Sequence, residues 1–586
     1  MSVHGPLPLR AGPLTALYSN GDIRDVRLGE TEVLRRIYPV FQDLNWTARP
    51  WLIDNERIDV GKEYFEIAYD LRGTFDAASL SGSVAISGNA EGAIAFAIDL
   101  SAAEAFWRNR LGLCVLHPMN VAGFACRIES PAGEVLDSSF PVRISPHQPF
   151  ADIRAISHLV DDATWATVRL EGETFEMEDH RNWSDASFKT YCTPLSLPFP
   201  VEVQPGDRIV QAATLRVGDE CETPEPWDDS TSIMLIDEVT PRPLIGLQVA
   251  LEETPTTEQL GLLRALELDH LRVDVDSSDP EARDLILAAR AQADDIGSRL
   301  IVAVTVDEPA NLDHLADLSA IATLWLVFDA QAKVTGAATL ASARAAFGPD
   351  VPIGGGTNLY FTELNREPPQ TDHIDAVAFS LNPQVHSSDD LTIVQNLQTQ
   401  FEIAINAASL ADGAPLIVGP VTLRPRFNPN ATAPELDVSN TSLPSNVDRR
   451  QKTNLGACWV AMSLKYLADA GTVSAITYFE TIGWRGVMER AEGSPQPADF
   501  PSQPGATFPV YDILAAIAGF PYVRSCLATN PELVDALVLE DESGRRRLIV
   551  VNFTDETREV RLHGFSRDLI QLEPLSYAIV DERAAP

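Results

Sequence analysis

The sequence has few cysteines and no long apolar run. Six cysteines occur among 586 residues, and they form no Cys-x-x-Cys pair. Scattered cysteines of this kind favour reduced thiols in a cytosol over a disulfide framework. No stretch approaches the roughly 18 consecutive apolar residues of a membrane-spanning helix. The N-terminus also lacks the basic region and apolar run of a signal peptide, so we expect a cytoplasmic protein with no membrane partner.

Positive charge is scarce as well. Lys and Arg together number 44 against 84 Asp and Glu, which gives a formal net charge of −40. Nucleic acids bind clustered Lys and Arg, so we expect no nucleic-acid partner. Hydrophobic residues make up 45% and charged residues 22% of the chain. These values are typical of a globular protein and argue against wholesale disorder.

Several familiar catalytic motifs are absent. The sequence contains no G-x-S-x-G elbow, no G-x-x-x-x-G-K-[ST] loop and no G-x-G-x-x-G turn. Their absence argues against the α/β-hydrolase, P-loop and dinucleotide-binding classes. The ten histidines include no pair four residues apart and no His-x-His. Because neighbouring ligands of that kind are the usual sign of a zinc site, we expect no metal and no cofactor.

The chain is long enough for about two to four domains, and its patterning divides it into three. Residues 1–240 carry short β-branched and aromatic segments between Gly, Asp and Pro turns, which predicts an N-terminal β-sandwich-like domain. The stretch 221–243, rich in Pro and acidic residues, is typical of a linker. Residues 506–586 hold one helical segment followed by strand-like runs, which predicts a small C-terminal β-sandwich.

Residues 241–505 alternate short apolar runs with segments of helical period. Two of these segments, at 254–258 and 278–281, begin with a cap-type residue, Pro and Glu. Eight strand–helix alternations over this length predict a TIM (β/α)8 barrel, whereas a doubly wound open sheet would usually have fewer strands. The predicted strands are residues 246–250, 270–275, 299–306, 323–328, 351–353, 376–381, 415–419 and 474–479.

Catalytic residues are expected just after these strands, because barrel enzymes carry their sites at the carboxyl ends of the strands. Glu480 follows the eighth run directly, so it should be partly desolvated, and the resulting raised pKa suits acid–base work. Glu363 lies in a loop that a run of glycines introduces after the fifth strand. We expect these two carboxyl groups to be catalytic. The alternative for each is a structural carboxylate tied to an arginine.

The same strand ends offer polar and aromatic side chains for substrate binding. His386, after an Asn-Pro pair, can donate to a sugar hydroxyl or an oxyanion, or can be an ordinary surface histidine. Trp484 can stack on a sugar ring or pack in the core. The complete set expected to bind substrate is Asn358, Arg366, Asn382, His386, Arg424 and Trp484.

The N-terminal region holds the densest polar cluster, at residues 178–189. Six ionisable side chains lie there among Trp183 and Phe188. A solvated loop rarely carries so many aromatic residues. We therefore expect the cluster either to fasten this domain to the barrel or to reach over the barrel mouth.

Five segments resemble the D-apionate lactonase family: LRRIYPVFQDLNW, NRLGLCVLHP, FPVRISPHQPFADI, FEMEDHRNWSDASFKTYCTPL and SLNPQVHSSDD. The resemblance runs over most of the chain, and its N-terminal segments are the most specific part. It implies an N-terminal β-domain, a central TIM barrel and a C-terminal β-domain. It also implies a small sugar lactone as the binding partner, with hydrolysis of D-apionolactone to D-apionate in apiose catabolism. It assigns no catalytic residue.

The layout also resembles, more weakly, the clan A glycoside hydrolases. Those enzymes place an acid/base Glu, preceded by Asn, after the fourth strand and a nucleophile Glu after the seventh. Here the fourth run ends in FDAQ, with Asp329, and TLRPR follows the seventh. Retaining glycosidases need two carboxyl groups about 5–5.5 Å apart, and Glu363 and Glu480 follow strands nearly opposite each other. This departure favours a lactonase, with a glycosidase or a non-catalytic sugar-binding protein as the alternatives.

Overall fold

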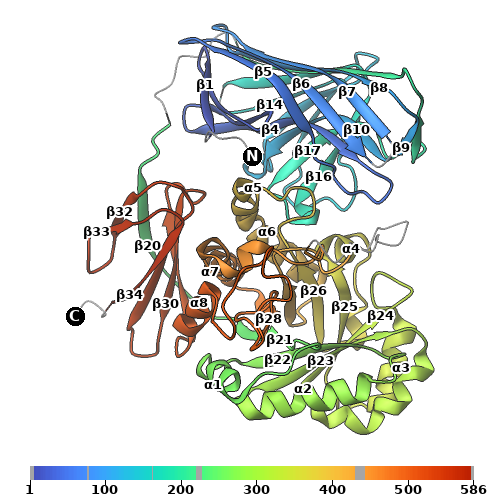
Figure 1. The fold of residues 1–586 in the computed structure, drawn as a ribbon, viewed down its shortest axis with the longest axis vertical. Helices are drawn as coiled ribbons and strands as arrows, with labels where there is room; N and C mark the ends of the chain where they lie inside the picture. The colour runs from blue at the N-terminus through green and yellow to red at the C-terminus, as the bar shows by residue number, and fades with distance from the viewer. Residues whose placement is uncertain (1–5, 76–77, 162, 219–226, 429–442, 583–586) are drawn as a thin grey trace. The chain divides into compact units, whose positions relative to one another are not determined.

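The computed structural model describes residues 6–75, 78–161, 163–218, 227–428 and 443–582 (Figure 1). These residues divide into two compact units. The N-terminal unit comprises the described residues of Met1–Arg181 and Ala186–Asp228, together with Asn428. The barrel unit comprises Asn182–Asp185, Asp229–Phe427 and the described residues of Asp437–Pro586. Four residues from within the N-terminal sequence therefore pack with the barrel unit.

The N-terminal unit is a sandwich of two antiparallel sheets with one shared core. Its strands alternate buried with more exposed side chains, as β2 (Leu14–Ser19) illustrates. The first sheet has the order β1 (Leu7–Ala11), β2, β3 (Asp22–Leu28), β4 (Thr31–Gln42), β10 (Arg110–Pro118), β17 (Ser187–Tyr191), β16 (Phe175–Asp179) and β13 (Phe150–Ile153). The second has the order β12 (Val135–Ser139), β11 (Ala125–Glu129), β14 (Ala155–Leu159), β15 (Trp165–Glu171), β19 (Arg208–Val217), β8 (Ala93–Ala102), β7 (Ala78–Gly88), β6 (Phe65–Phe75) and β5 (Leu52–Val60).

Smaller elements complete this part of the chain. The strands β9 (Phe106–Arg108) and β18 (Val201–Val203) form a two-stranded sheet. Two short 3₁₀ helices are η1 (Met119–Val121) and η2 (His180–Trp183). The sandwich agrees with the β-rich N-terminal domain that the sequence predicts.

The barrel unit is built on eight parallel strands that close on themselves, which confirms the predicted TIM barrel (Figure 1). Each predicted run overlaps one strand. The strands are β21 (Leu244–Gln248), β22 (His270–Asp276), β23 (Arg299–Val306), β24 (Leu324–Asp329), β25 (Ile353–Tyr360), β26 (Ala376–Leu381), β27 (Leu416–Val421) and β28 (Val473–Glu480). The connecting helices are α1 (Thr257–Ala265), α2 (Ala282–Ile296), η3 (Pro309–Ile321), α3 (Ala337–Phe347), α4 (Phe361–Arg366), η4 (Thr371–His373), α5 (Asp390–Gln395), η5 (Asn396–Gln398), α6 (Thr399–Leu410), η6 (Arg449–Lys452), α7 (Asn454–Asp469) and α8 (Pro509–Ile517).

Local sequence signals set some of these boundaries. The helix α1 begins after Thr256. The Thr256 side chain accepts from the Gln259 backbone amide, and the Gln259 side chain accepts from the Thr256 backbone amide. This reciprocal capping satisfies two of the donors that every helix start leaves unpaired. The helix α2 ends at Gly297, which has a left-handed φ of 78° and suits glycine because no Cβ is present to clash.

The strand β25 runs further than the sequence predicts, and the predicted loop around Glu363 is wrong. The glycine run continues the strand to Tyr360, and Glu363 lies in the helix α4 that follows. Gly356 explains the extension, because a Cβ there would lie 2.4 Å from the Ala378 carbonyl oxygen of β26. Glycine lets the two strands approach closely at this point. Assigning the glycines to a loop, as the sequence interpretation does, misses this close approach.

A seven-stranded sheet forms the C-terminal part of the barrel unit. Its order is β33 (Leu569–Leu572), β32 (Arg558–His563), β20 (Thr231–Pro241), β29 (Tyr522–Ala528), β30 (Val534–Glu540), β31 (Arg546–Asn552) and β34 (Ser576–Glu582). Figure 1 shows β20, in green, among these red strands. The linker predicted over 221–243 is therefore wrong for this segment. β20 comes before the barrel in sequence, yet it pairs antiparallel with β29 and parallel with β32.

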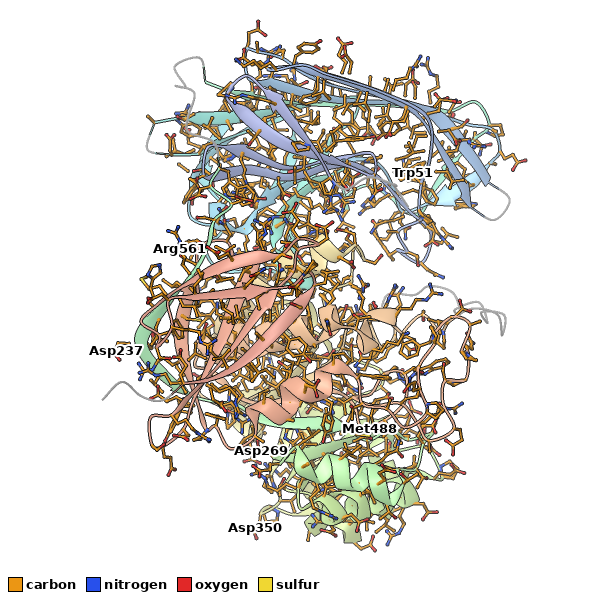
Figure 2. The ribbon with its side chains drawn as sticks, turned by 60° about the vertical axis from the view of Figure 1, so that its left-hand side comes forward. Trp51, Asp237, Asp269, Asp350, Met488 and Arg561 are labelled. Carbon is orange, nitrogen blue, oxygen red and sulfur yellow. The ribbon has the colours of Figure 1, made fainter. Side chains whose placement is uncertain are left out.

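Exposed and buried ion pairs hold this sheet together and join it to the barrel. Asp237 of β20, labelled in Figure 2, is fully exposed and accepts from Arg524 of β29 at 2.9 Å. Deeper in the unit, Lys465 of α7 donates to Asp535 of β30 at 2.7 Å, with both side chains buried. Tyr466 donates to the second Asp535 oxygen at 2.7 Å. A buried charge pair of this kind is costly to break on one side, so it fixes the sheet against α7.

The described cysteines are buried free thiols: Cys114, Cys126, Cys192, Cys458 and Cys526. The sixth, Cys221, lies outside the described residues. No helix in the described parts of the chain has the length and apolar character to cross a lipid bilayer.

Candidate active site

A cavity of ≈ 310 Å³ opens at the carboxyl ends of β21, β27 and β28. This is the end of the barrel where enzymes of this fold carry their sites. The lining combines carboxylates, guanidinium groups, amides and one indole ring. It consists of Gln248, Glu252, Thr422, Leu423, Arg424, Arg426, Asn446, Asp448, Gln451, Phe479, Glu480, Trp484 and Arg485.

A bulge at the end of β28 sets the direction of Glu480. Along β21 and β28, Leu247 pairs with Tyr478 but Gln248 pairs with Glu480, so Phe479 is an extra residue. Phe479 has a φ of 32°, a region that bulky side chains rarely adopt. Bulges re-aim side chains next to active sites, and strained backbone is concentrated at functional positions. The extra residue turns Glu480 into the cavity.

Glu480 combines burial with a cationic neighbour. Its Oε1 accepts from Arg485 Nε at 2.9 Å, and its side chain is 17% exposed. Burial raises the pKa of the Glu480 carboxyl, and Glu252 adds to this, while Arg485 acts in the opposite direction. The net shift is upward. A carboxyl group with a raised pKa can hold a proton closer to neutral pH and exchange it with a substrate.

A second network fixes Arg426 on the other side of the cavity. Its Nη2 donates to Asn358 Oδ1 at 2.6 Å and to the Asn358 carbonyl at 2.8 Å. Fully buried Arg272 donates to the same Oδ1 at 2.9 Å and to Asp274 at 2.7 Å. Burial lowers the pKa of Arg426 to about 10, against the attraction of Asp274. Arg426 therefore remains a cation at neutral pH, held in a fixed orientation.

A third network holds Arg424. Its Nε donates to Asp448 Oδ2 at 3.3 Å, and Gln384 Nε2 donates to the same oxygen at 2.7 Å. Burial on its own would raise the pKa of Asp448, but the hydrogen bonds and charge of Arg450 lower it to about 2. Asp448 is thus a permanent anion that anchors Arg424 at the cavity wall.

The structure brings some of the predicted site residues together. Glu480, Arg424 and Trp484 all line the cavity. Asn358 and Asn382 line a neighbouring pocket of ≈ 10 Å³. That pocket shares Thr422 and Arg426 with the cavity, so the two spaces are adjoining parts of the same barrel mouth.

The other predicted residues stand apart from these walls. Glu363, buried in α4, accepts from Lys333 Nζ at 2.9 Å. The Arg366 guanidinium lies 5.3 Å from the centre of the Trp183 ring. The His386 Nδ1 lies 2.7 Å from Asp185 Oδ2. None of these three predicted residues is among the cavity-lining side chains.

Some site residues were not selected from the sequence. Arg485 lies in the GWRG segment right after Glu480, and an arginine so close to a candidate catalytic carboxylate could have been paired with it. Arg272 stands within a barrel strand, where a charged side chain is out of place unless it serves a polar site. Asp448 and Asn446 carry no sequence signal, because the fold alone brings the segment before η6 to the mouth.

The segment Asn182–Asp185 belongs to the barrel unit and contacts the residues that follow β25 and β26. Thr362 donates to the Asn182 carbonyl, and Asn365 donates to Asn182 Oδ1 at 2.8 Å. The Trp183 ring meets the edges of Tyr360 and His386, with ring centres 6.1 and 5.9 Å apart. Part of the predicted polar cluster 178–189 is therefore built into the barrel mouth.

Fold and cavity together define a class: a (β/α)8-barrel protein with a largely buried carboxyl group beside fixed guanidinium cations at the carboxyl ends of its strands. The chain matches all three domains of one family. These are described as D-apionate lactonase, N-terminal domain, at residues 2–220, the TIM barrel domain at 245–521 and the C-terminal immunoglobulin-like domain at 531–584. The chain belongs to the D-apionate lactonase family. It is a sugar-processing hydrolase of the carboxylic ester hydrolase class, a lactonase.

One named relative agrees with this assignment. The D-apionate lactonase of Brucella anthropi is 28% identical, over 98% of this chain and 96% of that protein. Among solved structures, the GH51 arabinofuranosidase from Xanthomonas axonopodis pv. citri is 10% identical, with a TM-score of 0.40 over 60% of this chain and 95% of that one. A conserved exported protein from Bacteroides fragilis is 8% identical, with a TM-score of 0.42 over 60% and 100%. TM-scores this low carry no functional argument.

Proposed function

We propose that this protein hydrolyses D-apionolactone to D-apionate in apiose catabolism. The observation that carries the proposal is the match to a relative named D-apionate lactonase over 98% of this chain. The cavity supports it, because ≈ 310 Å³ falls at the lower end of the roughly 300–1,000 Å³ range of small-molecule sites. A small sugar lactone is the substrate class that fits such a space.

Lactone opening requires a limited set of groups. Water attacks the acyl carbon, the ring C–O bond breaks, and the leaving alkoxide takes up a proton. We assign this proton transfer to Glu480 as general acid/base, because its carboxyl group has a raised pKa and faces the cavity. Arg485 stabilises the ionised form each time the proton leaves.

The negative charge that develops on the carbonyl oxygen needs fixed donors. Arg426 and Arg424 both line the cavity, and each is held by an acceptor, Asn358 for Arg426 and Asp448 for Arg424. Preorganised cations of this kind stabilise an oxyanion without reorganising during the reaction. We therefore assign oxyanion stabilisation to these two arginines.

A second carboxylate in the cavity is Glu252. It lines the same walls as Glu480 and contributes to the upward pKa shift of that residue. Glu363, the second carboxylate expected from the sequence, is paired with Lys333 and does not line the cavity. We propose Glu252 as the group that orients substrate hydroxyls, with Trp484 as a platform for the sugar ring.

We propose that the reaction proceeds without a metal ion. Three guanidinium cations, those of Arg424, Arg426 and Arg485, line the cavity. They offset the charge of the three carboxylates in the same lining, Glu252, Asp448 and Glu480, so the lining has no excess negative charge to attract a divalent cation. The arginines already supply the electrostatic stabilisation that a metal would offer.

The test is direct hydrolysis. Purified protein is incubated with D-apionolactone, and acid release is followed by titration at constant pH above the spontaneous rate. We expect saturable acid release. Parallel incubation with a p-nitrophenyl apiofuranoside tests the glycosidase alternative. Nitrophenol release without lactone opening would overturn the proposal.

A further inference from the structure

We propose that a small chamber beside the cavity holds the water molecule that attacks the lactone, and that Glu480 takes the proton from this water. The inference rests on the proposed lactone hydrolysis and deepens it, because it identifies where the nucleophile binds. The side chamber has a volume of ≈ 20 Å³, and residues at and after the ends of β21 and β28 line it. All of these residues belong to the barrel unit.

The side chamber and the cavity are adjoining spaces. They share four lining residues: Glu252, Glu480, Trp484 and Arg485. A volume of roughly 10–15 Å³ is needed to hold one water molecule, so ≈ 20 Å³ accommodates a water and is too small for a sugar lactone. Because Glu480 lines both spaces, its carboxyl group lies between a water in the chamber and a substrate in the cavity.

The side chamber offers both acceptors and donors to a water molecule. Arg485 Nε donates to Glu480 Oε1 at 2.9 Å, and no described residue donates to Glu480 Oε2. The Glu252 carboxyl group likewise accepts no hydrogen bond from the described parts of the chain. Arg490 Nη1 donates to Glu253 Oε1 at 3.0 Å, which leaves Arg490 Nη2 as a further donor. An ordered water typically makes about 3 hydrogen bonds, and these groups can supply them.

The charges around the side chamber favour water over a metal cation. Glu480 is paired with Arg485, and Glu253 is paired with Arg490. Of the three carboxylates in the lining, Glu252 alone has no arginine partner among the described residues. Divalent cations are bound by several oxygen ligands at once. A single unpaired carboxylate is therefore a poor cation site but a sufficient acceptor for one water hydrogen.

Hydrogen bonds hold the wall of the side chamber in place. The Gly483 amide donates at 2.9 Å to the carbonyl of Met488, which is labelled in Figure 2, and the Gly486 amide donates to the Gly483 carbonyl at 2.8 Å. Buried Gln259 of α1 donates through Nε2 to the Glu489 carbonyl at 2.9 Å. The loop after β28 is thus tied to itself and to α1, so a water bound against it has a fixed position. Such positioning of a reactant accelerates its attack.

The atoms balance in this arrangement. The water oxygen bonds to the acyl carbon, the carbonyl π pair moves onto oxygen, and the Glu480 carboxylate takes the water proton. When the pair returns, the ring C–O bond breaks and its electrons leave with the alkoxide, which takes the same proton from Glu480. Lactone plus water gives the hydroxy acid, and Glu480 ends as a carboxylate. One group can serve both steps because it lines both spaces.

Competition by methanol tests the side chamber in the wild-type protein. Methanol is larger than water by a methyl group, and its attack on the lactone would give the methyl ester. A chamber that fits one water should exclude it. We expect D-apionate as the only enzymatic product, as measured by mass spectrometry of early time points against a protein-free sample. Enzymatic methyl ester in proportion to the added methanol would show that the nucleophile enters through the open cavity, and would overturn the proposal.

The variant Arg490→Ala should open the side chamber to methanol, because it removes a side chain from the lining. We expect methyl ester to form with this variant. The matched control is Arg344→Ala, since Arg344 is also ion-paired and is 27% exposed, against 26% for Arg490. Arg344 donates to the Val351 carbonyl, just before β25, at the amino end of that strand. The control should give D-apionate alone. An Arg490→Ala variant that still excludes methanol would contradict the proposal.

The variant Ala250→Val should fill the side chamber. Ala250 is 5% exposed and lines the chamber but not the cavity. Displacing or shifting the water should lower kcat by about 10–10²-fold, with little change in KM, because the lactone occupies the larger space. The control is Ala322→Val, since Ala322 is 9% exposed and precedes β24, at the amino end of that strand. A folded Ala250→Val variant with wild-type kcat would overturn the proposal.

The outcomes separate the two proposals. A wild-type protein without lactonase activity overturns the proposed function. An active wild type that also forms methyl ester overturns only the side chamber as the water site. The methanol measurement on the wild type needs no substitution, so it remains decisive even where Arg490→Ala or Ala250→Val fails to fold.

Discussion

Arg485 and Glu480 are joined twice. The Arg485 Nε donates to Glu480 Oε1 at 2.9 Å, and the Glu480 amide donates to the Arg485 carbonyl at 3.0 Å. The side-chain bond stabilises the ionised carboxylate, and the backbone bond ties the loop between the two residues to the end of β28. The cationic partner of Glu480 is therefore fixed by the same short segment that carries the carboxyl group. This double link makes Glu480 the first position to test.

The variant Glu480→Gln should lower kcat on the lactone by about 10²–10⁴-fold. Glutamine keeps the size of the side chain and can still accept from Arg485, but it cannot exchange a proton. KM should change less, because the lost interaction matters in the transition state. Steady-state kinetics with D-apionolactone measure both quantities.

A matched control for this variant is Glu540→Gln. Glu540 of β30 accepts from Arg524 Nε at 2.6 Å, the same kind of ion pair, on the seven-stranded sheet. Its loss should leave kcat unchanged. Equal losses of activity in the two variants would show that general destabilisation, and not proton transfer, explains the first result.

Chelation should leave the reaction intact. The cavity walls carry the arginines that we assign to oxyanion stabilisation, so extended EDTA treatment followed by desalting should retain full kcat. Elemental analysis of the same sample provides the check. Stoichiometric zinc in the untreated protein, with activity that disappears on chelation and returns on zinc addition, would refute a metal-independent mechanism.

The N-terminal sandwich should lose stability in acid through His158. Its ring is buried against His117 at 5.0 Å, and neither of its nitrogens has a hydrogen-bond partner. Burial lowers the pKa of His158 to about 4 from an ordinary 6.5. Between these values the unfolded chain binds a proton that the folded chain does not. The free energy of unfolding therefore falls as pH drops below 6.5, by about 2 kcal/mol at pH 5 relative to neutral pH.

The variant His158→Leu removes this proton linkage and two buried unpartnered nitrogens. It should raise Tm at pH 5 by more than at pH 7.5, as measured by calorimetry at both values. His563→Leu is the control, since His563 is exposed on β32. An identical shift of Tm at the two pH values in His158→Leu would contradict the linkage.

Gly356 should tolerate no side chain. Its φ is 113°, and an added Cβ would lie 2.4 Å from the Ala378 carbonyl oxygen. Gly356→Ala should lower Tm and also reduce kcat/KM, because Asn358, two residues further on, holds Arg426. Gly261→Ala is the contrasting control. Gly261 lies in α1 with no atom within 4 Å of its Cβ position, so alanine there should stabilise the helix by up to about 1 kcal/mol.

The sequence predicts the barrel because each of its strands is a local signal. A short apolar run followed by a helical segment can be recognised without knowing its neighbours, and all eight runs overlap strands. β20 shows the limit of this reasoning. Its pairing with β29 and β32 involves residues some 280 to 330 positions away, and a Pro- and acid-rich surrounding hides its strand pattern.

For the candidate site too, local sequence signals predict some features, and contacts between distant segments decide the rest. The rule that site residues follow the barrel strands selects Glu480, Arg424 and Trp484, which line the cavity. The same rule selects Glu363, which does not line the cavity. Glu363 instead pairs with Lys333, which comes from a different connection of the barrel. Composition and strand order do not reveal which charged groups will meet. That depends on side-chain packing at the mouth, where distant segments such as the one containing Asp448 converge.

The position of β20 has a consequence for biosynthesis. This strand leaves the ribosome before any barrel strand, whereas its neighbours β29 and β32 emerge only after the whole barrel has been translated. During that interval β20 has unpaired backbone groups on both edges, which are prone to wrong pairing. A nascent chain arrested within the barrel should therefore recruit chaperones through Thr231–Pro241. Translation of β29 and β32 ends that exposure, so the synthesis of these late strands completes the sheet around β20.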